Sequence, residues 1–384
     1  MQPILKTTEE LEKYLEKLNN SKVIFLDTEF KRRDTYFPIL CLIQLSVAGE
    51  IVLIDPSIKD CKLDPLIKVL SDHNILKVLH SARQDLEILY FYTKDKPIGP
   101  IFDTQVAAAF CGLGLSVSYE SLVNDFMNVA LDKSQRITDW EKRPLSDKQI
   151  KYALNDVLYL PQIYERLEDT LTKKGYNKYY KEEALLLEDH NNFQISDEKL
   201  LKKIKFDSKD PQKIAKLLRL IKWREKLAAK LNINRAQIIS DVEIYLLVFK
   251  FSASSIFEEL DEDTALTIKN LLTAPPAEDE QIRAKAIIKK KFSSQLKLNR
   301  NLCKVILQLV AIDSDIAESI IATSDDLNYL VQHDLGSDPS KEMRIMKGWR
   351  YEIYGKTLED FCSGHAAIRI EGPELTIVKA HQLH

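Results

Sequence analysis

Glycine is scarce in this chain, at 10 of 384 residues, against the usual ~7% of globular proteins. So little glycine argues against β-sandwiches, propellers and glycine-rich phosphate loops, and it favours a helix-rich protein. Long apolar runs are also missing. The longest uncharged run, residues 104–119, includes Thr, Gln, Gly and Ser, whereas a membrane-spanning helix needs ~20 mostly apolar residues. We therefore expect no transmembrane helix.

Cysteine is limited to five widely separated residues, at positions 41, 61, 111, 303 and 362. Their number is odd and no CxxC pair is present, which argues against zinc and redox motifs. We interpret all five as reduced residues of the core. The start of the chain, residues 1–6, shows no basic segment followed by an apolar one, so we expect no secretory signal. These features predict a cytoplasmic protein without membrane association.

The charge of the chain is unevenly distributed. Apolar residues make up 45% and charged residues 29%, as in ordinary globular proteins, and the length predicts about two to three domains. Residues 199–304 contain 23 basic and 13 acidic residues, a net charge of +10. Because the whole chain carries −3, the remaining residues carry −13. Such a basic segment suits a polyanionic partner, although a run of charge is more often only a solvated helix face.

The first half of the chain has the pattern of an α/β domain. Short apolar runs between turn residues predict strands at residues 23–26, 41–47, 51–54 and 76–79, with an edge strand at 101–102. Apolar residues at helical spacing predict helices near residues 63–70 and 86–90. From residue 105 to about 171 we expect an almost wholly helical stretch, with Ser146 as an N-cap and a kink at Pro161.

The second half is predicted to be helical. Beyond about residue 207 no strand pattern returns until the final residues, where apolar runs occupy 367–370 and 375–378. Two adjacent prolines at 275–276 interrupt the helical region. We therefore predict a first domain over residues 1–200, a helical domain over 207–291, a second helical subdomain over 295–361 and a tail over 362–384 whose role is open.

The first predicted strand ends with two acidic residues, Asp27 and Glu29. Side chains at alternate positions of a strand point to one face, ~6.6 Å apart, so the two carboxylates converge beside a hydrophobic sheet. Mg²⁺ and Mn²⁺ prefer such carboxylate oxygens and would offset the repulsion. Taken alone the pair is a weak signal, because about nine triplets with an acidic residue at both ends arise by chance in a chain this acidic. Two acidic residues at a solvated strand end would show the same pattern.

Three more residues accompany this pair. Asp85 lies at the start of the helix predicted after the fourth strand, where a carboxylate also interacts favourably with the helix dipole. Tyr152 and Asp156 stand four residues apart on a late helix and share a face. Neither feature is decisive alone, but the order of all five residues along the chain is informative.

That order resembles the DEDD superfamily of 3′→5′ exonucleases, in its tyrosine-bearing branch. Longer strings resemble bacterial ribonuclease D: FLDTEF at 25–30, IQL at 43–45, DTQ at 103–105, TDW at 138–140 and RPL at 143–145. The string IKWR at 221–224 and the helices after it resemble the HRDC module that this family shares with RecQ-type helicases. Residues 302–361, with GWR at 348–350, resemble the family's further C-terminal helical subdomain. The resemblance covers residues 4–361, and the tail lies outside it.

The resemblance implies a ribonuclease H-like exonuclease domain, a mixed sheet flanked by helices, followed by all-α HRDC-like domains. It also implies two divalent metal ions, Mg²⁺ or Mn²⁺. Asp27, Glu29 and Asp156 would bind the first ion, and Asp27 would bridge to a second that Asp85 holds directly or through water. Tyr152 would orient the attacking water, because a phenol with a pKa of about 10 is a poor base at neutral pH.

Several other residues have a more ordinary interpretation. We expect His80 to be packed or to support the site rather than to bind metal, and Asp103 to shape the site without being a ligand. We expect the tryptophans to anchor the core rather than to stack on bases; they are Trp140, Trp223 and Trp349. Arg136 and Arg143, just before the helix of Tyr152 and Asp156, are the expected phosphate contacts.

The function expected from this resemblance is metal-dependent 3′→5′ exoribonuclease activity that releases nucleoside 5′-monophosphates. The expected partner is structured RNA with a single-stranded 3′ end, with tRNA precursors undergoing 3′-end maturation as the natural substrate. A DNA exonuclease of the same superfamily stays open, because no 2′-hydroxyl contact can be identified from the sequence. A non-catalytic nucleic-acid-binding protein that uses the basic HRDC-like module is a third alternative, against which the intact set of five residues argues.

Overall fold

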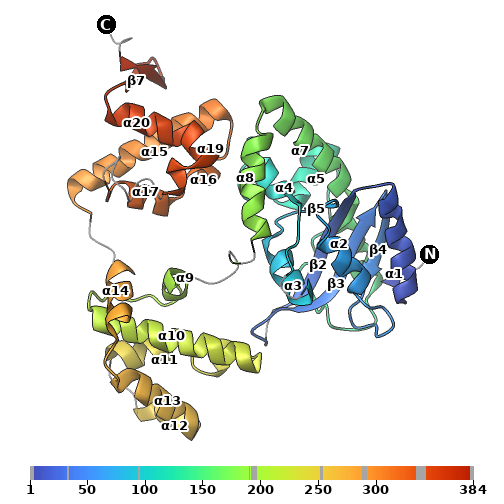
Figure 1. Cartoon of the computed structure of the whole chain (residues 1–384), viewed down its shortest axis with the longest axis horizontal. Coiled ribbons are helices and arrows are strands. Elements are labelled where there is room, and N and C mark those ends of the chain that lie inside the picture. The colour runs from blue at the N-terminus through green and yellow to red at the C-terminus, as the bar shows by residue number, and fades with distance from the viewer. Residues whose placement is uncertain are drawn as a thin grey trace. The chain divides into compact units, whose positions relative to one another are not determined.

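The computed structural model describes residues 4–32, 34–93, 96–189, 191, 197–250, 254–287, 292–333 and 343–380. The chain divides into two compact units, whose elements are labelled in Figure 1. The first unit combines Met1–Glu29, Cys41–His190 and Phe292–His384, and the second combines Phe30–Leu40 and Asn191–Lys291. Within the described ranges, no helix is both long and apolar enough to cross a membrane.

A six-stranded sheet lies in the first unit, in the order β1-β4-β3-β2-β5-β6. Its strands are β1 (Ile4–Leu5), β2 (Val23–Lys31), β3 (Ile39–Val47), β4 (Glu50–Ile54), β5 (Leu76–Leu79) and β6 (Ile101–Asp103). β3 and β4 are antiparallel, whereas the pairs β1–β4, β2–β5 and β5–β6 are parallel. The predicted mixed sheet is thus confirmed, with β6 at an edge. The strand β1 was not predicted, because two residues are too few to show an alternation of apolar and polar side chains.

Helices pack around this sheet. They are α1 (Thr8–Leu15), α2 (Asp64–Leu70), α3 (Arg83–Thr93), α4 (Thr104–Phe110), α5 (Tyr119–Met127), α6 (Asp147–Leu158), α7 (Leu160–Lys174) and α8 (Asn177–Glu188). Ser146 caps α6 through a capping box, as predicted. Pro161 lies in the first turn of α7 instead of kinking one long helix, because a first-turn residue needs no N–H partner.

The expectation of an almost wholly helical stretch over 105–171 is wrong for residues 111–118 and 128–146. Gly112 and Gly114 adopt positive φ angles of 77° and 94° after α4. Asn128 ends α5 in the left-handed conformation, with φ 57°. In the loop that follows, Asp132 accepts hydrogen bonds from the backbone N–H and the hydroxyl of Ser134. Such local side-chain bonds compete with helix formation.

The second unit is helical. It contains α9 (Asp197–Lys202), α10 (Pro211–Leu231), α11 (Asp241–Tyr245), α12 (Ser254–Glu259), α13 (Glu262–Thr273) and α14 (Glu278–Ile287). The predicted proline break falls between α13 and α14. Trp223 packs, partly buried, against the core of this unit, and the neighbouring Arg224 is buried and pairs with Asp241 at 2.7 Å. Tyr36, in the segment 30–40, donates a hydrogen bond to Glu225 at 3.1 Å.

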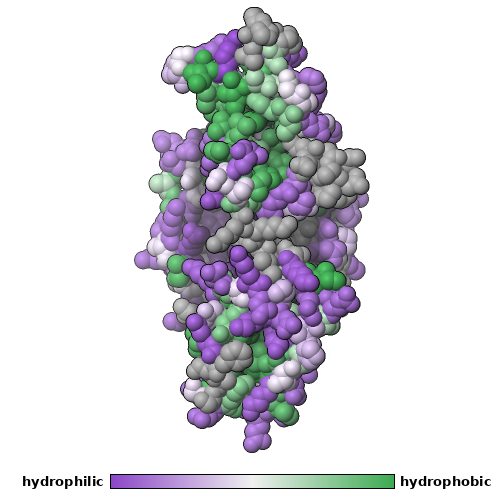
Figure 2. Space-filling view, turned by 90° about the vertical axis from the view of Figure 1, so that its left-hand side faces the viewer, coloured by the Kyte–Doolittle hydropathy of each residue, from purple (hydrophilic) through white to green (hydrophobic). Residues whose placement is uncertain are grey.

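The C-terminal part of the first unit begins with helices and ends in a hairpin. Its elements are α15 (Ser294–Ser314), α16 (Glu318–Ile321), α17 (Ser324–Leu330), α19 (Gly348–Arg350), α20 (Lys356–Cys362), β7 (Ala366–Glu371) and β8 (Glu374–Lys379). The antiparallel pair β7–β8 matches the apolar runs noted in the tail. Ile370 and Leu375 of this hairpin are exposed. The face shown in Figure 2 is mostly hydrophilic, with hydrophobic patches in both its upper and its lower part.

The cysteines are all free, but they are not all core residues. Cys41 and Cys61 are buried, whereas Cys111 and Cys303 are only partly buried. Cys362 is exposed at the C-terminal end of α20. The prediction that all five belong to the core is therefore wrong, because the spacing of cysteines in a sequence does not fix which helix face each occupies.

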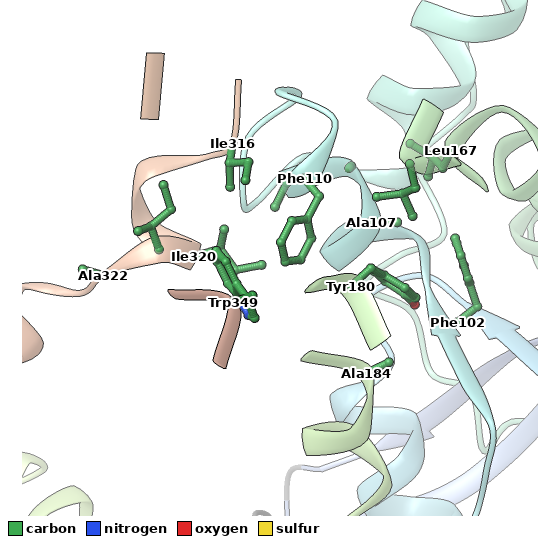
Figure 3. Close-up of a cluster of buried hydrophobic side chains, with 14 of the residues drawn as sticks. Phe102, Ala107, Phe110, Leu167, Tyr180, Ala184, Ile316, Ile320, Ala322 and Trp349 are labelled. Carbon is green, nitrogen blue, oxygen red and sulfur yellow. The ribbon is translucent and has the colours of Figure 1, made fainter. Parts of the chain in front are cut away.

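One hydrophobic core joins the sheet domain to the C-terminal helices. In Figure 3, Trp349 and Ile320 lie on one side of Phe110, and Tyr180 and Phe102 lie on its other side. The ring centroids of Trp349 and Phe110 lie 4.9 Å apart. Burial of Trp140 and Trp349, at 3% and 1% exposure, confirms their prediction as core anchors.

Polar contacts line the border of this shared core. Arg350 pairs with Glu183 of α8 at 2.5 Å. Lys174 pairs with Asp315 at 2.6 Å, beyond the end of α15. The C-terminal segments 292–333 and 343–380 therefore pack on α4, α7 and α8 and belong to the first unit.

Candidate active site

Three acidic side chains converge at the middle of the sheet. Asp27 and Glu29 project from β2, which lies between β3 and β5, and Asp156 projects from α6. One carboxylate oxygen from each lies within 4.8 Å of the others. The alternation along β2 and the helical spacing on α6 thus bring together residues that are more than 120 positions apart.

Asp85 lies near this cluster but outside it. The residue is buried in the first turn of α3, and the hydroxyl of Thr28 donates a hydrogen bond to its Oδ1. Its charge raises the pKa of both Asp27 and Glu29, so Asp85 acts electrostatically on the cluster. Thr28 was missed in the sequence, because nothing in a strand pattern shows that its hydroxyl reaches a helix 57 residues away.

Tyr119 fixes the end of α6 that carries Asp156. Its hydroxyl donates to the carbonyl of Asn155 at 2.8 Å and accepts from the N–H of Tyr159 at 3.1 Å. Tyr152 lies one turn before Asp156, with its ring centroid 6.1 Å from that of Trp140. The side chains of α6 that belong to the site are therefore held from both α5 and the loop before α6.

The four carboxyl groups have raised pKa values. Burial is the largest cause, and it raises the pKa of Glu29 to about 9 and that of Asp85 to about 7. The pKa values of Asp27 and Asp156 lie well above the usual range, again by burial first and then by neighbouring carboxylates. The hydrogen bond from Thr28 opposes this shift at Asp85.

This donor set fits a divalent cation. Among the described residues, Oδ2 of Asp156 is a buried carboxylate oxygen without a hydrogen-bond partner. Repulsion between like charges in a poorly solvated site is relieved either by protonation or by a bound cation. Carboxylate-only ligands are those of Mg²⁺ and Mn²⁺ rather than of softer metals. The arrangement of Asp27, Glu29 and Asp156 can therefore hold a hard metal ion.

Tyr152 remains a phenol at neutral pH. Burial, followed by the charges of Asp156 and Glu29, raises the pKa of its hydroxyl far above the ordinary value. A protonated hydroxyl in this position can donate a hydrogen bond, but it cannot act as a general base.

His80 and Asp103 support neighbouring structure. Nδ1 of His80 lies 2.9 Å from the hydroxyl of Thr104, and burial lowers the pKa of the imidazole. The carboxylate of Asp103 caps α4 by accepting from the N–H of Gln105 and Val106. Both residues make contacts within the fold, and the expectation that neither binds metal stays a prediction.

The two predicted phosphate contacts differ in their surroundings. Arg143 pairs with Asp55 at 2.5 Å and donates to the carbonyls of Trp140 and Cys41. Its guanidinium is thus engaged in holding the loop before α6. Arg136 is exposed, and its charge lowers the pKa of Glu120, a residue whose own charge raises the pKa of Asp156. Phosphate binding by either arginine stays a prediction.

Comparison with known proteins identifies related sequences and a related fold. Residues 2–172 match the family model described as 3′–5′ exonuclease. The chain is 34% identical to ribonuclease D of Bartonella henselae, over 95% of this chain and 91% of that protein. It is 30% identical to ribonuclease D of Sphingobium indicum over 98% of both chains.

The fold is also that of a solved structure. The crystal structure of Escherichia coli RNase D superimposes with a TM-score of 0.72 at 24% identity, over 94% of this chain and 98% of that one. This match includes the helical region beyond the exonuclease domain. With a 3′–5′ exonuclease domain, this fold and full-length relatives at 30–34% identity, the chain belongs to the ribonuclease D family.

Proposed function

We propose that this protein is a metal-dependent 3′→5′ exoribonuclease that removes nucleoside 5′-monophosphates one at a time. The observation that carries this proposal is the convergence of Asp27, Glu29 and Asp156 within 4.8 Å, with Asp85 close by, in a chain of the ribonuclease D family. The family membership favours RNA over the DNA alternative, and the four raised carboxyl pKa values favour a catalytic site over a purely binding one.

Each site residue has a defined task in this proposal. Asp27, Glu29 and Asp156 would hold one divalent ion, while Asp27 and Asp85 would hold a second. Such ions lower the pKa of an attacking water and stabilise the charge on the leaving 3′ oxygen. Tyr152 would donate a hydrogen bond from its hydroxyl to this water and so orient it, since its raised pKa keeps the hydroxyl protonated.

The natural substrate is proposed to be structured RNA with a single-stranded 3′ end, with tRNA precursors as the principal candidates. The related Escherichia coli RNase D is described as an exoribonuclease involved in structured RNA processing. In this chain, residues 199–291 of the second unit contain 20 basic and 13 acidic residues, a net charge of +7, which favours binding of a polyanion. We assign that role to the second unit, which we propose to be HRDC-like.

The direct test uses purified protein with 5′-labelled single-stranded RNA and DNA of one sequence, in Mg²⁺ or Mn²⁺ and in EDTA. We expect the RNA to shorten from its 3′ end in single-nucleotide steps, with 5′-monophosphates as products and no shortening in EDTA. Preferential digestion of DNA would instead identify the DNA exonuclease alternative. Binding of RNA without cleavage in either metal would identify a non-catalytic protein.

A further inference from the structure

The carboxylate of Asp103 joins two helix starts beside the active site. Its Oδ1 accepts from the N–H of Ser81 at 3.0 Å and its Oδ2 from the N–H of Ala82 at 2.8 Å. The same carboxylate accepts from Gln105 at 2.8 Å, at the start of α4. Asp103 itself is buried at the end of β6. One side chain therefore ties the turn between β5 and α3 to the first turn of α4.

That turn determines where Asp85 lies. The carbonyl of Ala82 accepts the first hydrogen bond of α3, from the N–H of Leu86 at 2.9 Å. Asp85 is in the turn closed by that bond. Ser81 adopts a positive φ of 59°, a conformation that costs a non-glycine residue free energy and persists when its surroundings hold it. The two N–H groups bonded to Asp103 are such a restraint.

Tyr180 of α8 contacts the backbone of Asp103. Its hydroxyl accepts a hydrogen bond from the backbone N–H of Asp103 at 2.8 Å. The ring of Tyr180 lies 4.7 Å from that of Phe102 and 6.4 Å from that of Phe110. Phe110 in turn packs on Trp349, as Figure 3 shows. A continuous row of buried side chains thus connects the C-terminal helices to the turn before Asp85.

We propose that Asp103 and Tyr180 are positioning residues of the nuclease site, through which the C-terminal helices of the first unit hold Asp85 in place. The metal-holding task of Asp85 rests on the proposed function, whereas the contact row does not. Trp349 also contacts α8 directly, because its ring stacks on that of Tyr179 and its Nε1 donates to Glu183 at 3.2 Å. On this account Trp349 acts on catalysis through Phe110 and α8, and Tyr180 carries that effect to Asp103.

Tyr180→Phe is the central test, because it keeps the ring and removes only the hydroxyl. Tyr176→Phe is the matched control: the Tyr176 hydroxyl donates to the carbonyl of Ser314 at 2.8 Å, within the same interface but away from β6. Both variants lose one tyrosine hydrogen bond between elements of the first unit. Only Tyr180→Phe leaves the buried N–H of Asp103 without a partner, so the two variants separate positioning from general stability.

The first measurement is hydrogen–deuterium exchange of the metal-free protein. Amides in the peptide covering residues 80–89 should exchange about tenfold faster in Tyr180→Phe, as expected for the loss of one buried hydrogen bond. The Tyr176→Phe protein should match the wild type in this peptide. Unchanged protection in Tyr180→Phe would overturn the proposal, whatever the activity of the enzyme.

The second measurement is the affinity for Mn²⁺ by calorimetry, together with kcat and KM on a short RNA oligomer. For Tyr180→Phe we expect about tenfold weaker Mn²⁺ binding and about tenfold lower kcat, because small misplacements of a catalytic group are costly. KM should be unchanged, and Tyr176→Phe should behave as the wild type. Equal effects of both variants would mean that stability alone is involved.

A mutant cycle tests the route from Trp349. Trp349→Leu should lower kcat in the wild-type background and have no further effect in the Tyr180→Phe background. Effects that multiply would show that Trp349 does not act through Tyr180. If Trp349→Leu does not fold, the milder Trp349→Phe replaces it in the same cycle. Loss of RNA cleavage by the wild type would affect only the proposed function, since the exchange experiment requires no substrate.

Discussion

Glu29→Gln should make the metal-free protein less sensitive to alkaline pH. In the folded protein, burial and the charges of Asp27 and Asp85 raise the pKa of Glu29 from 4.5 to about 9. Between those two values the unfolded chain has released the proton while the folded chain keeps it, so the folded state loses stability as the pH rises. Below about pH 4.5 both states are protonated and the group contributes no pH dependence.

The size of this effect follows from the pKa shift. Each pH unit within the window costs about 1.4 kcal/mol, so Glu29 lowers the free energy of unfolding by about 2.7 kcal/mol between pH 6 and pH 8. Partial exposure of the side chain makes this an upper figure, since water screens the charge. Glutamine does not titrate. Between pH 6 and pH 8, the melting temperature of the wild type should therefore fall by about 5 °C relative to that of Glu29→Gln.

Scanning calorimetry in EDTA at pH 6, 7 and 8 measures this difference. Glu9→Gln serves as the control, because hydrogen bonds in the first turn of α1 lower the pKa of Glu9, which places its titration below this range. Saturating Mn²⁺ should restore the stability that the wild type loses at pH 8. If the difference in Tm between Glu29→Gln and the wild type were the same at pH 6 and pH 8, the carboxylate cluster would be solvated and the reasoning wrong.

Three further predictions concern activity and assembly. Asp27→Asn should abolish hydrolysis in a labelled-RNA assay while far-UV circular dichroism stays unchanged, because this carboxylate is assigned to both ions; substantial turnover would remove that assignment. Tyr152→Phe should lower kcat by at least ~10²-fold with Mn²⁺ affinity preserved, and calorimetry that showed both lost would make the residue a ligand or a structural support. A chain ending near residue 200 should aggregate or melt at a lower temperature than the full chain, because Phe110 would lose its contact with Trp349; light scattering and calorimetry test this, and a monomer of full stability would contradict it.

Local patterns predicted five of the six strands of the sheet and placed the candidate site residues on their strands and helices. The apolar runs at 23–26, 41–47, 51–54 and 76–79 correspond to β2, β3, β4 and β5. Spacing alone placed Asp27 beside Glu29 on one strand face and Tyr152 beside Asp156 on one helix face. Such periodicities depend only on the local backbone geometry, so they do not change with the packing of the rest of the chain. Their meaning as a metal site came from the family resemblance and not from spacing.

Contacts that depend on long-range packing could not be predicted in this way. The hydroxyl of Thr28 on Asp85 and that of Tyr119 on α6 join residues 57 and 36 positions apart. Hydroxyl groups have no periodic signature, and their partners are set only when the elements pack. The prediction of a helix over residues 128–146 was wrong for a similar reason. Polar side chains in this loop bond to the nearby backbone, while the apolar residues within it still suggest a helix face.

The position of the C-terminal helices shows why order along the chain differs from order in space. Trp349 and Phe110 are 239 positions apart and share one core, whereas residues 191–291 between them belong to a separate compact unit. Apolar spacing on a helix shows that one face is buried but not which surface covers it. Here that surface belongs to α4 and α8, which also carry the contacts of Asp103 and Tyr180. The nuclease unit is therefore completed by its last segment, and changes in that segment are expected to reach the carboxylates through packing rather than through contact with RNA.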